Sequence, residues 1–170
     1  MTSEIKIRQE LTSDHGMIYS VTEAAFKGKA YAGGDEQIIV DRLRKSGRLS
    51  LSLVAHIDDA VVGHIAFSPA KTRDNSQSWF ALGPVSVLPK YQGNGIGAKL
   101  IRLGLTQVQR QRALGCILTG NPEYYRKFNF ELAPEYAPSD SERDHFMLMC
   151  FTKVKPNGPL LFDPAFYGEI

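Results

Sequence analysis

The sequence has little excess charge, few cysteines and no long apolar run. Its 170 residues contain 20 Lys and Arg against 18 Asp and Glu, a formal net charge of +2. A nucleic-acid-binding protein needs a clustered basic face. The near balance of charges gives no electrostatic reason to expect nucleic-acid binding. No apolar run reaches membrane-spanning length, and Met1 to Glu4 lack the basic and then apolar order of a signal peptide. We therefore expect no nucleic-acid partner, no membrane partner and a cytoplasmic location.

The two cysteines, Cys116 and Cys150, both lie inside apolar runs that are typical of strands. Free thiols fit a reducing compartment, and the simplest role for each is that of a small buried hydrophobic residue. Neither lies in a motif that activates a thiol, so we expect no covalent intermediate on cysteine. No group of Cys and His has the spacing of a metal site. The sequence thus predicts no metal.

The chain has the length of one domain with a sizeable core. It shows neither an internal repeat nor a linker. We predict a single domain over residues 1–170, with its core at about 5–151 and an irregular tail at 152–170. The aromatic residues of this tail could cover the chain's own sheet or that of a second copy, so a homodimer is one of two interpretations.

Hydrophobic periodicity predicts an alternation of strands and helices. Strands are expected at 5–8, 49–57, 60–68, 79–88, 115–119, 130–132 and 146–151, with a hairpin turn at Asp58 and Asp59. Helices are expected through 17–26, at 36–45 with Ile38, Ile39 and Leu43 directed inward, at about 98–114, and from Pro122 onward. The order of these elements is a mixed α/β layout.

The most informative stretch runs from Val85 to Leu100 and contains a strand, a turn with three alternate glycines, and the start of a helix. Glycine lets the backbone approach a ligand closely, and the first N–H groups of a helix have no partner within it. The positive end of the helix dipole favours a pyrophosphate there. The spacing fits neither the phosphate loop of nucleotide triphosphatases, which needs a Lys and a hydroxyl after its last glycine, nor the dinucleotide fingerprint.

The segment Gln92-Gly93-Asn94-Gly95-Ile96-Gly97, preceded by Val87-Leu88-Pro89, resembles the acetyl-CoA signature of the GNAT superfamily of N-acetyltransferases. A second likeness is Tyr125, which stands four residues before Asn129-Phe130, where the family has a Gly-Phe pair. Asparagine replaces glycine there, and it also tolerates a left-handed backbone.

A third likeness lies in Gly63-His64-Ile65 and Phe67-Ser68-Pro69, which resemble a bacterial branch of the superfamily that acetylates small molecules. The resemblance to the family covers the chain from about Ile5 to Phe151.

The resemblance implies an α/β fold of the α+β type. Its central sheet is twisted, mixed and mostly antiparallel, is flanked by helices, and splays between the fourth and fifth strands to take the thioester of acetyl-CoA. The pantetheine arm would follow Val85 and Val87, with the Val87 N–H on the thioester oxygen. The pyrophosphate would lie on the N–H groups of Gln92, Gly93, Asn94, Gly95, Ile96, Gly97 and Ala98. Asn121 could bond the pantetheine amides or, equally, cap the helix that follows it.

Acetyl transfer to an amine needs an acid for the leaving thiolate and a base for the amine. Tyr125 is the candidate acid, because a phenol titrates at about 10; packing of a half-buried aromatic ring is the alternative. Many relatives carry a base on the fourth strand, but residues 79–88 contain no ionisable side chain. His64 in the neighbouring strand is the candidate base, and a structural histidine is the alternative. Further options are Glu23, Asp35, Glu36 or water.

The sequence thus predicts an N-acetyltransferase that moves the acetyl group of acetyl-CoA to a primary amine of a small molecule or peptide by direct attack in a ternary complex. A non-catalytic acyl-CoA-binding sensor, favoured by the missing base, and an acetyltransferase of a protein are the alternatives. Acceptor selection is expected in residues 27–35, 53–68 and 135–144, where Asp35, Glu36 and Asp140 could favour a cationic amine.

Overall fold

The computed structural model describes residues 4–168. Their strands form one sheet in the order β1-β2-β3-β4-β5-β7-β6, and β8 pairs with the far end of β3. The strands are β1 Ile5–Gln9, β2 Leu51–Ile57, β3 Ala60–Thr72, β4 Ser78–Val87, β5 Gly115–Thr119, β6 Glu131–Leu132, β7 Phe146–Cys150 and β8 Leu160–Leu161. Neighbouring strands are antiparallel except for β4 and β5, which are parallel. The mixed, mostly antiparallel sheet expected from the sequence is confirmed.

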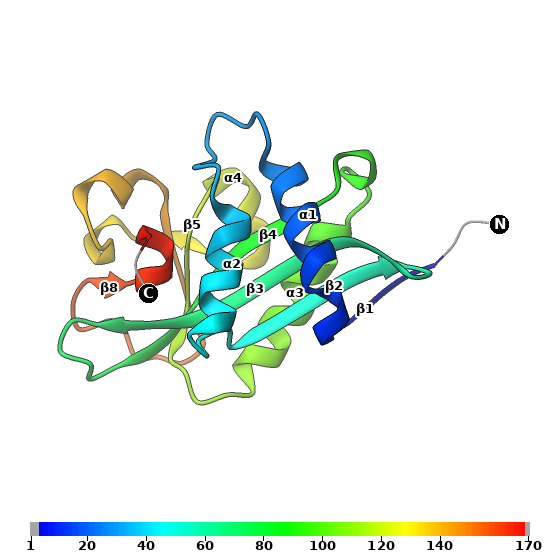
Figure 1. Cartoon of the computed structure of the whole chain (residues 1–170). Helices are drawn as coiled ribbons and strands as arrows, with labels where there is room; N and C mark the ends of the chain where they lie inside the picture. The colour runs from blue at the N-terminus through cyan, green and yellow to red at the C-terminus, as the bar shows by residue number, and fades with distance from the viewer. Residues whose placement is uncertain (1–3, 169–170) are drawn as a thin grey trace.

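Helices cover both faces of this sheet, with α1 and α2 on one face and α3 on the other (Figure 1). The α-helices are α1 His15–Phe26, α2 Glu36–Lys45, α3 Ile96–Gln109 and α4 Pro122–Tyr125. The 3-10 helices are η1 Thr12–Asp14, η2 Pro89–Tyr91, η3 Arg126–Phe128, η4 Pro134–Tyr136, η5 Asp140–His145 and η6 Pro164–Tyr167. Within residues 4–168, none of the helices combines the length and the apolar character needed to cross a membrane.

The core follows from the alternation of side chains along β2 and β3. On one face Leu53 and Phe67 pack with Leu100 of α3, and on the other Val54 packs with Ile18 of α1. Because both faces are covered, residues 51–55 are buried without interruption. The central strands are thereby held in a fixed position between two helical layers.

The strands β4 and β5 pair over a short distance and then part. Their register contains only Phe80 opposite Cys116 and Ala81 opposite Ile117. Beyond these pairs β4 follows β3 as far as Val87, whereas β5 follows β7. An extra residue in β4 at Gly83 and Pro84 shifts its register with β3 at the start of this separation. The splay expected between the fourth and fifth strands is thus present.

Helix α2 is turned differently from the prediction. Ile38 was predicted to point inward, but it is 38% exposed. The buried residues of α2 are Gln37, Ile39, Val40 and Leu43. Spacing by three residues puts Gln37, Val40 and Leu43 on one helix face. Because Val40 and Leu43 are needed in the core, a polar side chain is carried inward and an isoleucine remains outside.

Two predicted boundaries are also wrong. Helix α3 ends at Gln109 rather than near Leu114, because the Leu114 N–H donates to Ser78 O and its carbonyl accepts from the Phe151 N–H. Leu114 therefore belongs to the edge of the sheet. Strand β3 continues past Ser68 to Thr72 because β4 and β8 both pair with this extension.

The C-terminal tail is more regular than predicted. It contains β8 and η6, and an ion pair joins its buried Asp163 to Arg48. Arg42 of α2 donates to the carbonyl of Ala165 at 3.2 Å. The tail therefore connects the far end of β3 to α2.

Two glycines in helices allow a matched test of this packing. A Cβ on Gly104 of α3 would lie 2.4 Å from the buried ring of Phe67, whereas a Cβ on Gly16 of α1 would meet nothing within 4 Å. We expect Gly104→Ala to lower the free energy of unfolding by about 1–3 kcal/mol. The same change at Gly16 should raise it by up to about 1 kcal/mol, because alanine favours the helix. Urea denaturation measures both, and a stabilised Gly104→Ala protein would contradict the tight contact.

Candidate active site

The glycine turn between β4 and α3 depends on two left-handed residues. Gly93 and Gly95 both have φ of +81°, and Gly95 is the N-cap of α3. Residues with a Cβ rarely adopt this conformation, so glycine is required at both positions. Gly97 is different, because a Cβ there would make only ordinary contacts, 3.5 Å from the Tyr124 hydroxyl and 3.8 Å from Val87. Its missing side chain leaves free space that the protein's own packing does not need.

The turn presents a run of unused hydrogen-bond donors. The backbone N–H groups of Gly93, Asn94, Gly95, Ile96, Gly97 and Ala98 bond to no other residue between 4 and 168. Of the expected run, only the Gln92 N–H is taken, by Pro89 O at 3.3 Å. Six consecutive donors at a helix N-terminus favour an anion with several oxygens.

The side chains in the turn bind the turn itself. Gln92 Nε2 donates to the carbonyl of Val87 at 2.9 Å, and Asn94 Nδ2 donates to the carbonyl of Tyr91 at 3.1 Å. Gln92 thereby fixes the turn to the end of β4. The backbone, and not these side chains, is left to meet a ligand.

At the end of β4, some backbone N–H groups face the space between β4 and β5. The Leu88 N–H donates to Val62 O, and Ser86 lies opposite His64, so these even-numbered positions bond to β3. In an antiparallel pair the intervening residues point the other way. The N–H groups of Val85 and Val87 therefore face the side from which β5 has departed, the position expected for the pantetheine arm and the thioester oxygen.

Tyr125 of α4 lies in an aromatic cluster on the other side of the splay. Its ring centroid is 5.0 Å from that of Tyr124, 6.2 Å from that of Phe128 and 6.1 Å from that of Phe130. Burial raises the pKa of Tyr125 above its ordinary value, and no residue from 4 to 168 hydrogen-bonds its hydroxyl. The phenol is thus protonated at neutral pH and its proton is not committed elsewhere.

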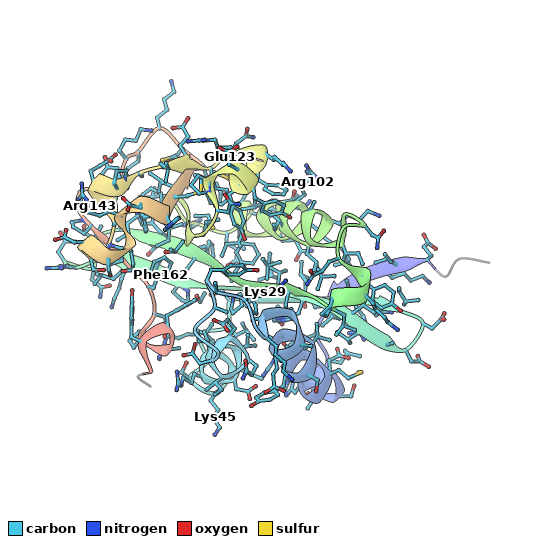
Figure 2. All side chains as sticks on the ribbon, turned by 90° about the horizontal axis from the view of Figure 1, so that it is seen from above. Lys29, Lys45, Arg102, Glu123, Arg143 and Phe162 are labelled. Carbon is cyan, nitrogen blue, oxygen red and sulfur yellow. The ribbon has the colours of Figure 1, made fainter. Side chains whose placement is uncertain are left out.

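Two positive side chains lie against the aromatic cluster of α4 and η3. The Arg102 guanidinium lies 4.9 Å from the centre of the Phe128 ring, and Lys127 Nζ lies 5.3 Å from that of Tyr124. Within the described chain neither forms an ion pair. Figure 2 shows Arg102 on the α3 side of the sheet, opposite α1 and α2. The charge on this side suits a polyphosphate.

His64 lies on the α1 and α2 side of the sheet and is fully buried. Its Nε2 is 2.8 Å from Ser52 Oγ, and the Ser52 hydroxyl donates to Glu10. Because that proton goes to Glu10, the Ser52 oxygen accepts from His64 Nε2–H. His64 Nδ1 is then the unprotonated nitrogen, and it has no partner among residues 4–168.

This chain of polar groups ends at the surface. Glu10 also accepts from Arg44 at 2.8 and 2.9 Å and lies 2.9 Å from His15. Burial opposes ionisation of Glu10, but the hydrogen bonds from Arg44 and Ser52 outweigh it, so its pKa lies below the ordinary value. Burial lowers the pKa of His64 to about 4. The arrangement of a neutral, solvent-free imidazole supports the structural interpretation of His64.

Two other predicted residues have clear local roles. Asn121 is the N-cap of α4, where its Oδ1 accepts from the Glu123 N–H at 3.0 Å. Cys116 is buried, and burial raises the pKa of its thiol. Within residues 4–168, no three His, Cys, Asp or Glu side chains come together as a potential metal site.

Sequence and structure comparisons agree on the family. The family described as "Acetyltransferase (GNAT) domain" matches residues 48–132, half of the chain. The curated Escherichia coli K12 protein "Uncharacterized N-acetyltransferase YhbS" is 32% identical over 131 residues, which are 76% of this chain and 75% of that protein. The chain belongs to the GNAT family of acetyltransferases.

Two solved GNAT structures cover nearly the whole chain. The Brucella melitensis enzyme, solved in complex with acetyl-CoA, has a TM-score of 0.86 and 44% identity over 97% of this chain and 99% of its own. The Escherichia coli YhbS structure, in complex with CoA, has a TM-score of 0.88 and 25% identity over 98% of this chain and 94% of its own. The predicted family, fold and enzyme class are therefore confirmed for this GNAT acetyltransferase.

Sequence reasoning missed several buried polar residues near the candidate site. Thr22 and Ser86 meet at 3.3 Å beside the end of β4, and Gln37 is buried below the loop between α1 and α2. The signal for Ser86 was available, since it alternates with Val85 and Val87 along the strand. The inward face of α2 could not be predicted in this way, because Ile38, Ile39 and Val40 form a run of apolar residues without a unique face.

The neutral, buried state of His64 has a measurable consequence. An unfolded histidine takes up a proton near pH 6.5, whereas folded His64 does so only at about 4. The unfolded state therefore binds more protons between these values. We expect the stability due to neutral His64 to be complete above pH 6.5 and to fall by about 1.4 kcal/mol per pH unit as the pH drops toward 4.

Urea denaturation between pH 5 and 7.5 measures this slope, and His64→Gln is the control that lacks it. Proton NMR of the His64 ring gives an independent value, and a ring that titrates near pH 6.5 in the folded protein would contradict the prediction.

Proposed function

We propose that this protein transfers the acetyl group of acetyl-CoA to the primary amine of a small molecule, by direct attack of the amine on the thioester. The observation that carries the proposal is the run of six unpartnered N–H groups at the start of α3, beside the strand edge at Val85 and Val87. These donors suit the pyrophosphate and the strand edge suits the pantetheine arm. The two similar GNAT structures, solved in complex with acetyl-CoA and with CoA, support this choice of co-substrate.

The Val87 N–H is the proposed donor to the thioester oxygen. When the amine nitrogen bonds to the carbonyl carbon, negative charge develops on that oxygen, and a fixed backbone donor stabilises it. Collapse of this intermediate breaks the carbon–sulfur bond. The products are the N-acetylated amine and the thiol of CoA.

Tyr125 is the proposed acid for the leaving sulfur. Its raised pKa keeps the phenol protonated, and its hydroxyl has no competing partner within residues 4–168. The thiolate takes the phenolic proton, which solvent then replaces. The amine releases its own proton to water, because His64 is enclosed by the protein and bonded to Ser52. Burial of Cys116 argues against an acetyl-cysteine intermediate and supports the direct route.

A non-catalytic sensor of acyl-CoA is the second candidate, favoured by the absence of an ionisable side chain from β4. The two functions differ in one measurement. Calorimetric titration with acetyl-CoA tests binding, and release of free thiol in the presence of a panel of amines tests turnover. Binding with turnover supports the enzyme, and binding without turnover supports the sensor. No binding would overturn both.

Gly97→Ala tests whether the pyrophosphate lies over the glycine turn. The protein alone accommodates the added Cβ, so we expect unchanged or slightly higher stability, because alanine is favoured over glycine in a helix by about 1 kcal/mol. A ligand in close contact with the turn would meet the new methyl group, and affinity for CoA should then fall at least roughly tenfold. Calorimetry with CoA measures the affinity. An unchanged affinity would remove the pyrophosphate from this position.

Tyr125→Phe tests the acid. The variant should fold normally, because the hydroxyl makes no hydrogen bond to residues 4–168. We expect kcat to fall roughly a hundredfold with little change in affinity for acetyl-CoA. Tyr19→Phe, on the exposed side of α1, is the matched control and should keep full turnover. Full turnover in Tyr125→Phe would exclude Tyr125 as the acid.

A further inference from the structure

A cavity of about 480 Å³ lies where α1 ends and α2 begins. Its walls come from the last turn of α1, the connecting loop and the first turn of α2, and they include Glu23, Phe26, Lys27, Lys29 and Gln37. None of these residues belongs to the glycine turn or to the aromatic cluster of Tyr125. The cavity is therefore separate from the proposed cofactor surface.

Helix α1, whose last turn borders the cavity, also contacts β4 near the proposed reaction centre. Thr22, the neighbour of Glu23, contacts Ser86 at 3.3 Å, and Ser86 precedes Val87. From the loop, Tyr31 packs edge-on against Phe26, with ring centroids 6.5 Å apart. Burial raises the pKa of Tyr125, and Tyr31 is close enough to add to this effect. One loop thus borders the cavity and reaches toward the proposed acid.

Gln37 presents an unused acceptor in this cavity. The side chain is only 6% exposed, and its Nε2 donates to the Gly34 carbonyl at 3.2 Å. Its Oε1 accepts no hydrogen bond from residues 4–168. Gln37 Oε1 is not among the fully enclosed atoms without a partner in residues 4–168, so it is open to water and to a ligand. This oxygen is suited to accept a hydrogen bond from an ammonium group.

The charged side chains that line the cavity carry both signs. Glu36 accepts from the N–H groups of Gly33 and Gly34 at 2.8 and 3.1 Å, so its carboxylate holds the loop together. Glu23, Lys27 and Lys29 form no ion pair with any residue between 4 and 168. The cavity thus offers one free carboxylate near the end of α1, where the helix dipole also favours a cation, and two free ammonium groups.

We propose that this cavity binds the acceptor as an amine that also carries a carboxylate, an amino acid. Gln37 Oε1 and Glu23 hold the amino group, and Lys27 and Lys29 pair with the carboxylate. A polyamine would place its second cation against these lysines and is disfavoured. The inference rests on the proposed function, which it extends from amines in general to one class of amine.

A competition experiment tests the acceptor class. The protein is incubated with acetyl-CoA and an equimolar mixture of the common amino acids, their amides and a set of diamines and polyamines, and acetylated products are quantified by mass spectrometry. An amino acid and its amide differ only in the carboxylate. We expect the acid to be acetylated roughly tenfold faster than its amide, because two lysines recognise that group.

Variants assign the preference to the cavity. In the double variant Lys27→Ala and Lys29→Ala, kcat/KM for the acids should fall roughly tenfold to the level of the amides, while the amides keep their rate. Lys45→Ala is the matched control, since Lys45 projects outward from the end of α2 (Figure 2), whereas Lys29 belongs to the loop that lines the cavity. Gln37→Met should raise KM for acids and amides alike with little effect on stability, because an apolar side chain of similar size replaces a buried amide.

The outcomes separate the inference from the proposed function. Acetylated amides or polyamines in equal or larger amount would overturn the inference and leave the enzyme function standing, as would a double variant that keeps the preference for acids. No acetylated product at all, from protein that binds acetyl-CoA by calorimetry, would overturn the inference together with turnover, because the mixture contains the class named here.

Discussion

The parting of β4 and β5 is the constraint on which the rest of this structure depends. A sheet satisfies its backbone groups through neighbouring strands, and here two pairs of residues are all that join these strands. Beyond them the edge at Val85 and Val87 needs another partner, and the six N–H groups of the next turn need one as well. A flexible chain with both donors and acceptors along its length, such as pantetheine with its pyrophosphate, can serve both. The unsatisfied groups of the fold and the shape of the co-substrate are therefore complementary.

Much of this site could be predicted from the sequence, because it depends on backbone conformation. The turn needs left-handed residues at Gly93 and Gly95, and few residue types other than glycine allow that. Asn129 likewise has φ of +71°, as its place before Phe130 required. The GNAT resemblance added the proposed role of Tyr125, which spacing alone cannot assign.

Other features depended on tertiary contacts and could not be predicted. Gln37 faces inward because Val40 and Leu43 of the same helix do, and only packing against α1 and the sheet decides between the possible faces. The bond between His64 and Ser52 depends on the register of a hairpin whose strands shift by one residue near Ala55. A histidine in an apolar strand is compatible with either a base or a structural role until its neighbours are known.

The connection of the C-terminal tail to α2 gives the protein a route to diversification. Ala165 bonds to Arg42 in the second half of α2, and Asp163 pairs with Arg48 just beyond the end of this helix. The first half of the same helix carries Gln37. None of these tail contacts involves α3 or the glycine turn. Substitutions near the end of the chain can therefore shift the tilt of α2, and with it the width of the neighbouring cavity, in a lineage whose machinery for the shared co-substrate stays intact.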